Sequence, residues 1–119
     1  MTSNNHRVER YLYEIRMEND RGAGQQRDLA YLYGGGDTLL CVVACVDDTQ
    51  SLAPPKKMAE GYVAGQMKLS NFANMIDMLR NEKPVYFAWS EEGSALRIAT
   101  GPEPVGEQEL RKLFSFLYI

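Results

Sequence analysis

The sequence is poor in the residue types that most often carry catalytic or metal chemistry. Its 119 residues include one histidine, His6, and two cysteines, Cys41 and Cys45. A nucleophilic site would have to use His6, which lies in the polar start of the chain, and a C-x₃-C pair matches no metal-ligand framework. On one extended strand the two cysteines lie roughly 13 Å apart, too far to bridge each other. The sequence therefore predicts reduced core cysteines in a protein that is not an enzyme and holds no metal or cofactor.

Long apolar runs and a charge of one sign are lacking as well. No stretch approaches the roughly 20 apolar residues that a membrane-spanning helix needs. The polar first residues have the wrong order for an export signal, so the cytoplasm is the expected location and no membrane partner is expected. The 13 basic and 16 acidic residues give a net charge of −3. Basic residues are not concentrated in one half of the chain, so the overall charge does not indicate nucleic-acid binding. A local basic patch could still bind nucleic acid.

The patterns that are present predict one domain over residues 1–119, rich in strands in its first half. Residues 1–6 are predicted to be disordered. Alternating apolar residues predict strands at 8–17, 29–33, 38–46 and 61–69, the third of them almost wholly apolar and therefore central. The glycine-rich run "GGGD" predicts a hairpin turn, whereas residues 18–28 are predicted to be a polar loop and residues 47–60 a mobile loop with two prolines.

The second half of the chain predicts two helices with two strands between them. Ser70 is a suitable N-cap, and a helical apolar stripe follows it at Phe72, Met75, Ile76 and Leu79. The helix must end before Pro84. Strands are predicted at 84–90 and 95–100, and a second helical stripe is formed by Leu110, Leu113, Phe114 and Leu117. The order ββββαββα predicts an α+β fold: an antiparallel sheet of about six strands with two helices packed on one face.

Two glycine-containing segments invite a phosphate-loop interpretation, and neither supports it. "GGGDT" lacks the Gly-Lys-Ser/Thr ending and joins two strands. "ATGPEPVGEQE" precedes the second predicted helix, but Glu107 and Glu109 would repel an anion at that helix start. We interpret both segments as structural.

Aromatic side chains on the predicted strands offer a stronger functional signal. They are interleaved with lysine and arginine, the pattern with which single-stranded nucleic acid is bound: bases stack on rings while cations contact phosphates. The opposing interpretation is that aromatic residues in sheets fill the core. From strand alternation, the predicted contact residues are Arg10, Arg16, Tyr62, Lys68, Tyr86 and Arg97.

The strand that runs directly into a helix at "GQMKLSNFANMIDML", with a second hairpin ending in "LRIATGPEPVGEQE", resembles the Whirly-like fold group of single-stranded-DNA-binding transcriptional regulators. The resemblance covers most of the chain and rests on the order of elements. It implies a curved antiparallel sheet backed by helices, assembly into dimers or larger oligomers, and nucleic acid on the exposed sheet. The Lys-Gly-rich motif of the plant members is missing. Two functions are therefore predicted: a homodimer that binds single-stranded DNA or RNA, or a self-associating protein-interaction module without such a ligand.

Overall fold

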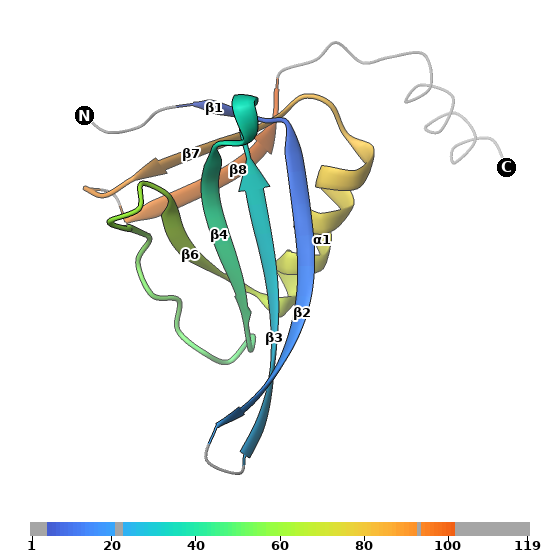
Figure 1. Cartoon of the computed structure of the whole chain (residues 1–119), viewed down its shortest axis with the longest axis vertical. Coiled ribbons are helices and arrows are strands. Elements are labelled where there is room, and N and C mark those ends of the chain that lie inside the picture. Colours follow the sequence, from blue (N-terminus) through green and yellow to red (C-terminus); the bar gives the residue numbers. More distant parts are fainter. Residues whose placement is uncertain (1–4, 21–22, 93, 102–119) are drawn as a thin grey trace, which may run out of the picture.

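The strands form two sheets in an α+β arrangement (Figure 1). The structure, a computed structural model, describes residues 5–20, 23–92 and 94–101, with side chains for all of them except 18–20 and 23–26. The larger sheet has the order β2 (Arg10–Asp20), β3 (Ala23–Tyr33), β4 (Leu39–Val46), β6 (Val63–Lys68), β5 (Lys56–Lys57). The smaller sheet has the order β1 (His6–Val8), β7 (Val85–Ser90), β8 (Ala95–Thr100). One α-helix, α1 (Leu69–Asn81), lies among the described residues.

The prediction of one antiparallel sheet of about six strands, backed by two helices, is wrong. The strands divide into sheets of five and three, and β4 pairs with β6 in parallel. The segment between those two strands, residues 47–62, exceeds the roughly twelve residues that a parallel crossover needs, and it makes the crossover without a helix. The second predicted helix lies outside the described residues.

A single residue separates the two sheets at the start of the chain. Glu9 lies between β1, which pairs with β7, and β2, which pairs with β3. Its backbone N–H donates to the carbonyl of Tyr33 at 2.7 Å, which ties the crossing point to the end of β3. His6 therefore lies in a strand, which corrects the prediction of disorder through residue 6, while residues 1–4 lie outside the described part.

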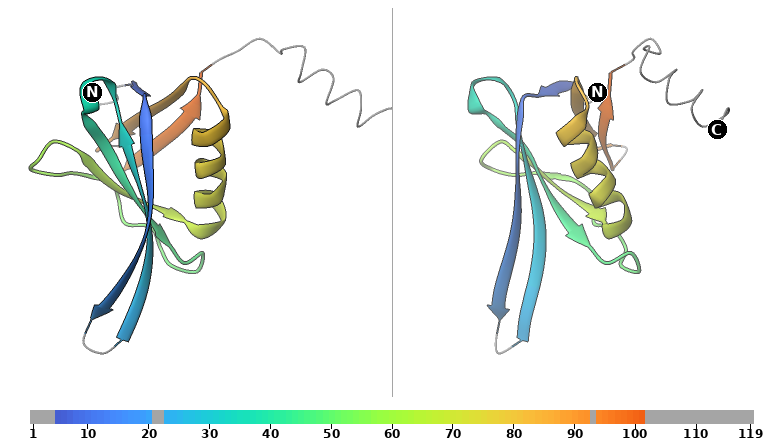
Figure 2. Two further views of the ribbon diagram at one scale, coloured as in Figure 1. Left: turned by 45° about the vertical axis from the view of Figure 1, so that its right-hand side comes forward. Right: turned by 90° about the vertical axis from the view of Figure 1, so that its right-hand side faces the viewer.

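The core lies between the inner faces of the two sheets and is closed by α1 (Figure 2). Leu32 from β3 and Val43 from β4 are fully buried, and Phe87 from the smaller sheet is 2% exposed. Phe72, Met75 and Ile76 form the buried stripe of α1, as the helical spacing predicted. Removing these apolar surfaces from water is the main favourable contribution to folding.

The two sheets approach each other closely at Gly65 in β6. A Cβ atom on this buried glycine would lie 2.7 Å from Cδ1 of Leu96 in β8. A side chain at this position would therefore require the end of the Leu96 side chain to shift.

The start of α1 is stabilised differently from the prediction. The helix begins at Leu69, and Ser70 lies inside its first turn. The backbone N–H of Ser70 donates to Oδ1 of Asp48 at 3.0 Å, so a carboxylate from the loop between β4 and β6 satisfies a free amide of the helix. A negative group at this end also complements the helix dipole.

Several other sequence predictions are confirmed. The helix ends at Asn81, before Pro84, and β7 and β8 match the two predicted late strands within one residue. The "GGGD" segment turns the chain between antiparallel β3 and β4 as the short 3₁₀ helix η1 (Gly35–Asp37), with positive φ at Gly36 and Asp37. Residues 47–60, predicted to be a mobile loop, contain β5, and the Ala53 N–H donates a hydrogen bond to Oε1 of Gln66. The mobility of this segment stays a prediction.

Candidate interaction surface

The hairpin of β2 and β3 extends well beyond the other strands (Figures 1 and 2). Its two strands pair over 11 residues each, whereas β4 pairs with β3 only from Leu29 to Tyr33. Residues 15–20 and 23–28 therefore pair only with each other, and we call them the arm; the other described residues are the body. The prediction of a polar loop over residues 18–28 is wrong, because both strands continue to within two residues of each other at the tip.

One face of the arm carries exposed apolar side chains. Ile15 is 57% exposed and Met17 is 73% exposed. Tyr11 and Tyr13 precede them on the same face of β2, because side chains alternate along a strand. Tyr11 packs against the core, and the Tyr13 ring lies 5.7 Å from that of Phe72 in α1. This row of side chains on β2 therefore begins in the core at Tyr11 and ends in solvent at Met17. Ile15 and Met17 form a continuous apolar strip on the arm.

The junction of arm and body is held by a hydrogen bond across the hairpin. The hydroxyl of Tyr13 donates to Oδ2 of Asp28 at 3.1 Å. Partial burial raises the pKa of Tyr13, and the hydrogen bond to Asp28 and its negative charge raise it further. The phenol therefore keeps its proton at neutral pH and remains a donor.

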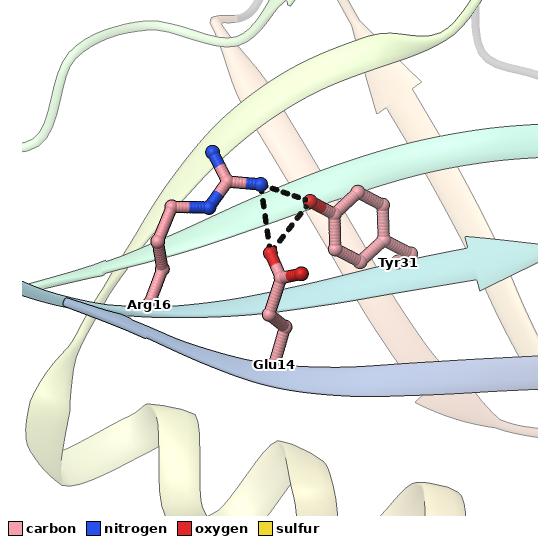
Figure 3. A network of polar contacts seen from close by, with 3 residues as sticks. All are labelled: Glu14, Arg16 and Tyr31. Atoms are coloured by element: carbon pink, nitrogen blue, oxygen red, sulfur yellow. Dashed lines mark hydrogen bonds and ion pairs between the residues drawn. The ribbon is translucent and has the colours of Figure 1, made fainter. Parts of the chain in front are cut away.

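The opposite, outer face of the same strands carries a network of three polar side chains (Figure 3), together with the half-exposed Leu12. A terminal nitrogen of Arg16 donates to Oε1 of Glu14 at 2.8 Å and to the Tyr31 hydroxyl at 3.2 Å. The Tyr31 hydroxyl in turn donates to Oε1 of Glu14 at 3.0 Å. Partial burial raises the pKa of Tyr31, and the contact with Glu14 acts in the same direction, so the Tyr31 phenol keeps its proton at neutral pH. All three groups lie at the base of the arm.

A second cation of the outer face is also engaged. Arg10 forms an ion pair with Asp37 of the β3–β4 turn. Its guanidinium lies 5.2 Å from the centre of the Tyr33 ring, within the range of a cation–π contact. Two of the cations that the sequence assigns to nucleic acid are therefore already paired with acidic side chains.

The free edge of β2 is the longest open strand edge in the described part of the chain. β2 is an outermost strand of the larger sheet and pairs on one side only, with β3. The opposite edge strand, β5, spans only Lys56–Lys57 and follows two prolines. Short length, lysine and proline are devices that prevent pairing at an edge, and β2 has none of the three; its charged side chains of both signs include Glu14 and Arg16.

The six residues predicted to contact nucleic acid divide between two surfaces. Arg10 and Arg16 lie on the outer face of the larger sheet, with Tyr62 just before β6 and Lys68 at its end. Tyr86 and Arg97 lie on the smaller sheet, on the side opposite to the core residues Phe87 and Leu96. Since both inner faces turn toward one core, the outer faces point away from each other, and the structure does not bring the six residues together.

Tyr86 and Arg97 themselves are neighbours. They line a hollow of about 220 Å³ at the end of β8, together with Asn5, Ala99, Thr100 and Gly101. A hollow of about 820 Å³ lies elsewhere, between α1, β6, β8 and residues 52–55. Within the described ranges no group of three or more His, Cys, Asp or Glu side chains could hold a metal ion.

The residues that the sequence interpretation missed are Ile15 and Met17. Alternation along the predicted strand 8–17 places them on the same face as Tyr11 and Tyr13, but it does not show which part of that face is buried. No signal in β2 alone shows where the opposing layer ends. In the structure Tyr13 still contacts Phe72 of α1, whereas Ile15 and Met17, further along β2, are more than half exposed.

Over the described residues no helix is long and apolar enough to cross a membrane. Comparisons with protein-family models, curated proteins and solved structures gave no match. The Whirly-like resemblance therefore stays a prediction, and the function has to be argued from the geometry of the chain itself.

Proposed function

We propose that this protein is a self-associating protein-interaction module and that the arm is its contact surface. The observation that carries the proposal is the apolar strip of Ile15 and Met17 beside an open strand edge. Fully burying an isoleucine or methionine side chain is worth about 1.5–3 kcal/mol, so covering this strip favours association. An open edge adds main-chain hydrogen bonds to the same contact.

The charges around the arm support a protein partner over a polyanion. Arg10 is paired with Asp37, and Arg16 with Glu14. A nucleic acid would have to compete with these carboxylates for the cations and would meet their negative charge. A protein surface can instead match both signs.

Sedimentation velocity on the full chain tests this function. We expect the wild type to shift from monomer to a larger species as its concentration rises, and Ile15→Ser to shift the midpoint to higher concentration. Leu52→Ser is the matched control, because Leu52 is a similarly exposed aliphatic residue, 48% against 57%, on a loop of the body. A wild type that stays monomeric, or a control as disruptive as Ile15→Ser, would contradict the proposal.

Single-stranded nucleic acid is the second candidate, and the neighbouring Tyr86 and Arg97 favour it. An aromatic ring beside a cation is the minimal arrangement for stacking one base and contacting one phosphate. Titration of a fluorescent single-stranded oligonucleotide at low and moderate salt tests it. We expect binding that weakens steeply with salt and is lost in Arg97→Ala. No binding at low salt would exclude this candidate.

A further inference from the structure

We infer that the partner of β2 is β2 of a second copy, paired antiparallel with Ile15 at the twofold centre, so that Glu14 of each chain lies opposite the partner's Arg16. This inference rests on the proposed function and specifies its geometry. In this register the numbers of two facing residues add up to 30, so that Tyr13, for example, faces the partner's Met17. The two five-stranded sheets then join edge to edge into one sheet.

Strand length favours this register. β2 runs from Arg10 to Asp20, and Ile15 is its central residue. Pairing about Ile15 therefore uses all 11 residues of both strands, and any other centre leaves some of them unpaired. Beyond Arg10 the edge ends, because Glu9 passes to the smaller sheet.

Hydrogen-bond geometry restricts the alternatives. Along an edge strand the N–H and C=O groups of every second residue point outward, since those of the others bond to the inner neighbour. Outward-pointing residues of one strand must pair with outward-pointing residues of the other. Because these are every second residue of the same strand, their numbers are all odd or all even, and the two numbers of each pair sum to an even number. The registers nearest to a sum of 30 therefore have sums of 28 and 32.

Charge separates these three registers. A sum of 28 places Glu14 opposite the partner's Glu14, and a sum of 32 places Arg16 opposite the partner's Arg16. Like charges directly opposite each other destabilise a strand pair, and opposite charges stabilise it. At a sum of 30 both Glu14–Arg16 contacts are between opposite charges. The ion pair that exists within each chain, at 2.8 Å, can then extend into a four-residue network across the dimer.

The apolar face agrees with the same register. Ile15 meets the partner's Ile15, and Met17 meets the partner's Tyr13. Tyr13 already contacts Phe72 of α1. Met17, the most exposed apolar side chain described in the arm, is thereby placed against the partner's Tyr13, where the core reaches the surface.

Charge-reversed variants test the register. Glu14→Arg leaves two bases at these positions and Arg16→Glu leaves two acids. We expect each variant alone to self-associate at least roughly tenfold more weakly than wild type, because two like-charge contacts form per dimer. An equimolar mixture of the two should form a heterodimer of near wild-type affinity. Glu91→Arg, the same change at an exposed turn of the body, should leave association unchanged.

Mixing distinguishes an intermolecular pair from an intrachain one. Both single variants lose the Glu14–Arg16 contact within their own chain, and mixing cannot restore it. Recovery of association in the mixture therefore requires the contact between chains. Circular dichroism of each variant confirms that the fold is retained.

A disulfide gives a second, independent readout. In a Cys45→Ala background, Ile15→Cys places two thiols opposite each other at the centre, and oxidation should give a covalent dimer. Leu12→Cys is the control: its counterparts lie six residues apart along the strands, roughly 20 Å, beyond the reach of a disulfide. The native Cys41 is buried and does not interfere.

The outcomes distinguish a wrong register from a wrong proposed function, which is self-association through the arm. Heterodimer recovery together with cross-linking at position 15 alone supports the register. If the wild type associates and Ile15→Ser weakens it, but mixing restores nothing and neither cysteine cross-links, the arm is the contact surface and the register is wrong. A monomeric wild type would overturn both.

Discussion

The body and the arm use the same alternating pattern with opposite results. In the body, Leu32 and Val43 alternate with outward residues and are fully buried. In the arm, Ile15 and Met17 continue an equally regular alternation and are more than half exposed. A period of two determines which face a side chain occupies. Whether that face is buried depends on a second layer, which α1 and the smaller sheet provide for the body and nothing in the described chain provides for the arm.

The largest expected effect comes from breaking the body. Phe87 is 2% exposed and lies in the centre of the core. Phe87→Ala should lower the free energy of unfolding by about 3–5 kcal/mol, since it removes a buried ring and leaves a cavity. Urea unfolding followed by circular dichroism measures this loss. A change below about 1 kcal/mol would show that the two sheets do not share a core at Phe87.

A smaller effect is expected from the buried thiol of the body. Burial raises the pKa of Cys41 from 9.0 to about 12. Below pH 9 the thiol keeps its proton in both states. Above pH 9 the unfolded chain loses the proton first, so stability falls until the pH passes about 12. Between pH 9 and 11 the cost is on the order of 2 kcal/mol.

The comparison variant for this pH effect is Cys41→Ala. Tyr13 and Tyr31 also have raised pKa values and lower the stability in the same pH range, but they are present in both proteins. The free energy of unfolding should therefore fall more steeply with pH in the wild type than in Cys41→Ala. Parallel curves would show that water reaches the Cys41 thiol in the folded protein.

Much of the body could be predicted from the sequence because its signals are local. The stripe of Phe72, Met75 and Ile76 specified α1, and the strand predicted at 84–90 matches β7 within one residue. Failures occur where distant segments decide. Asp48 stabilises the start of α1 from the loop between β4 and β6, so the apparent N-cap Ser70 was misleading. The division into two sheets depends on one residue, Glu9, at which nothing in the local pattern changes.

The candidate surface was less predictable for a related reason. Residues 18–28 contain few apolar side chains, and a polar segment with glycines is typical of a loop. Here the two strands satisfy each other's backbone groups, and that pairing requires no hydrophobic pattern in the sequence. Arg10 and Arg16 were correctly placed on the outer face, but their acidic partners, Asp37 and Glu14, became apparent only from the fold.

The smallest effect on folding is expected from a substitution of Met17. The same substitution tests most directly whether the arm, and not the body, is the association surface. At concentrations too low for association, Met17→Ser should change the free energy of unfolding by no more than about 0.5 kcal/mol, because the side chain is 73% exposed. At high concentration the wild type gains stability by mass action, since its dimer forms from the folded state. Thermal unfolding at two concentrations about 100-fold apart separates the two contributions. The melting temperature of the wild type should rise with concentration and that of Met17→Ser should rise less. An equal rise in both proteins would place the association surface outside the arm, and the exposed strip would then be a feature of the monomer alone.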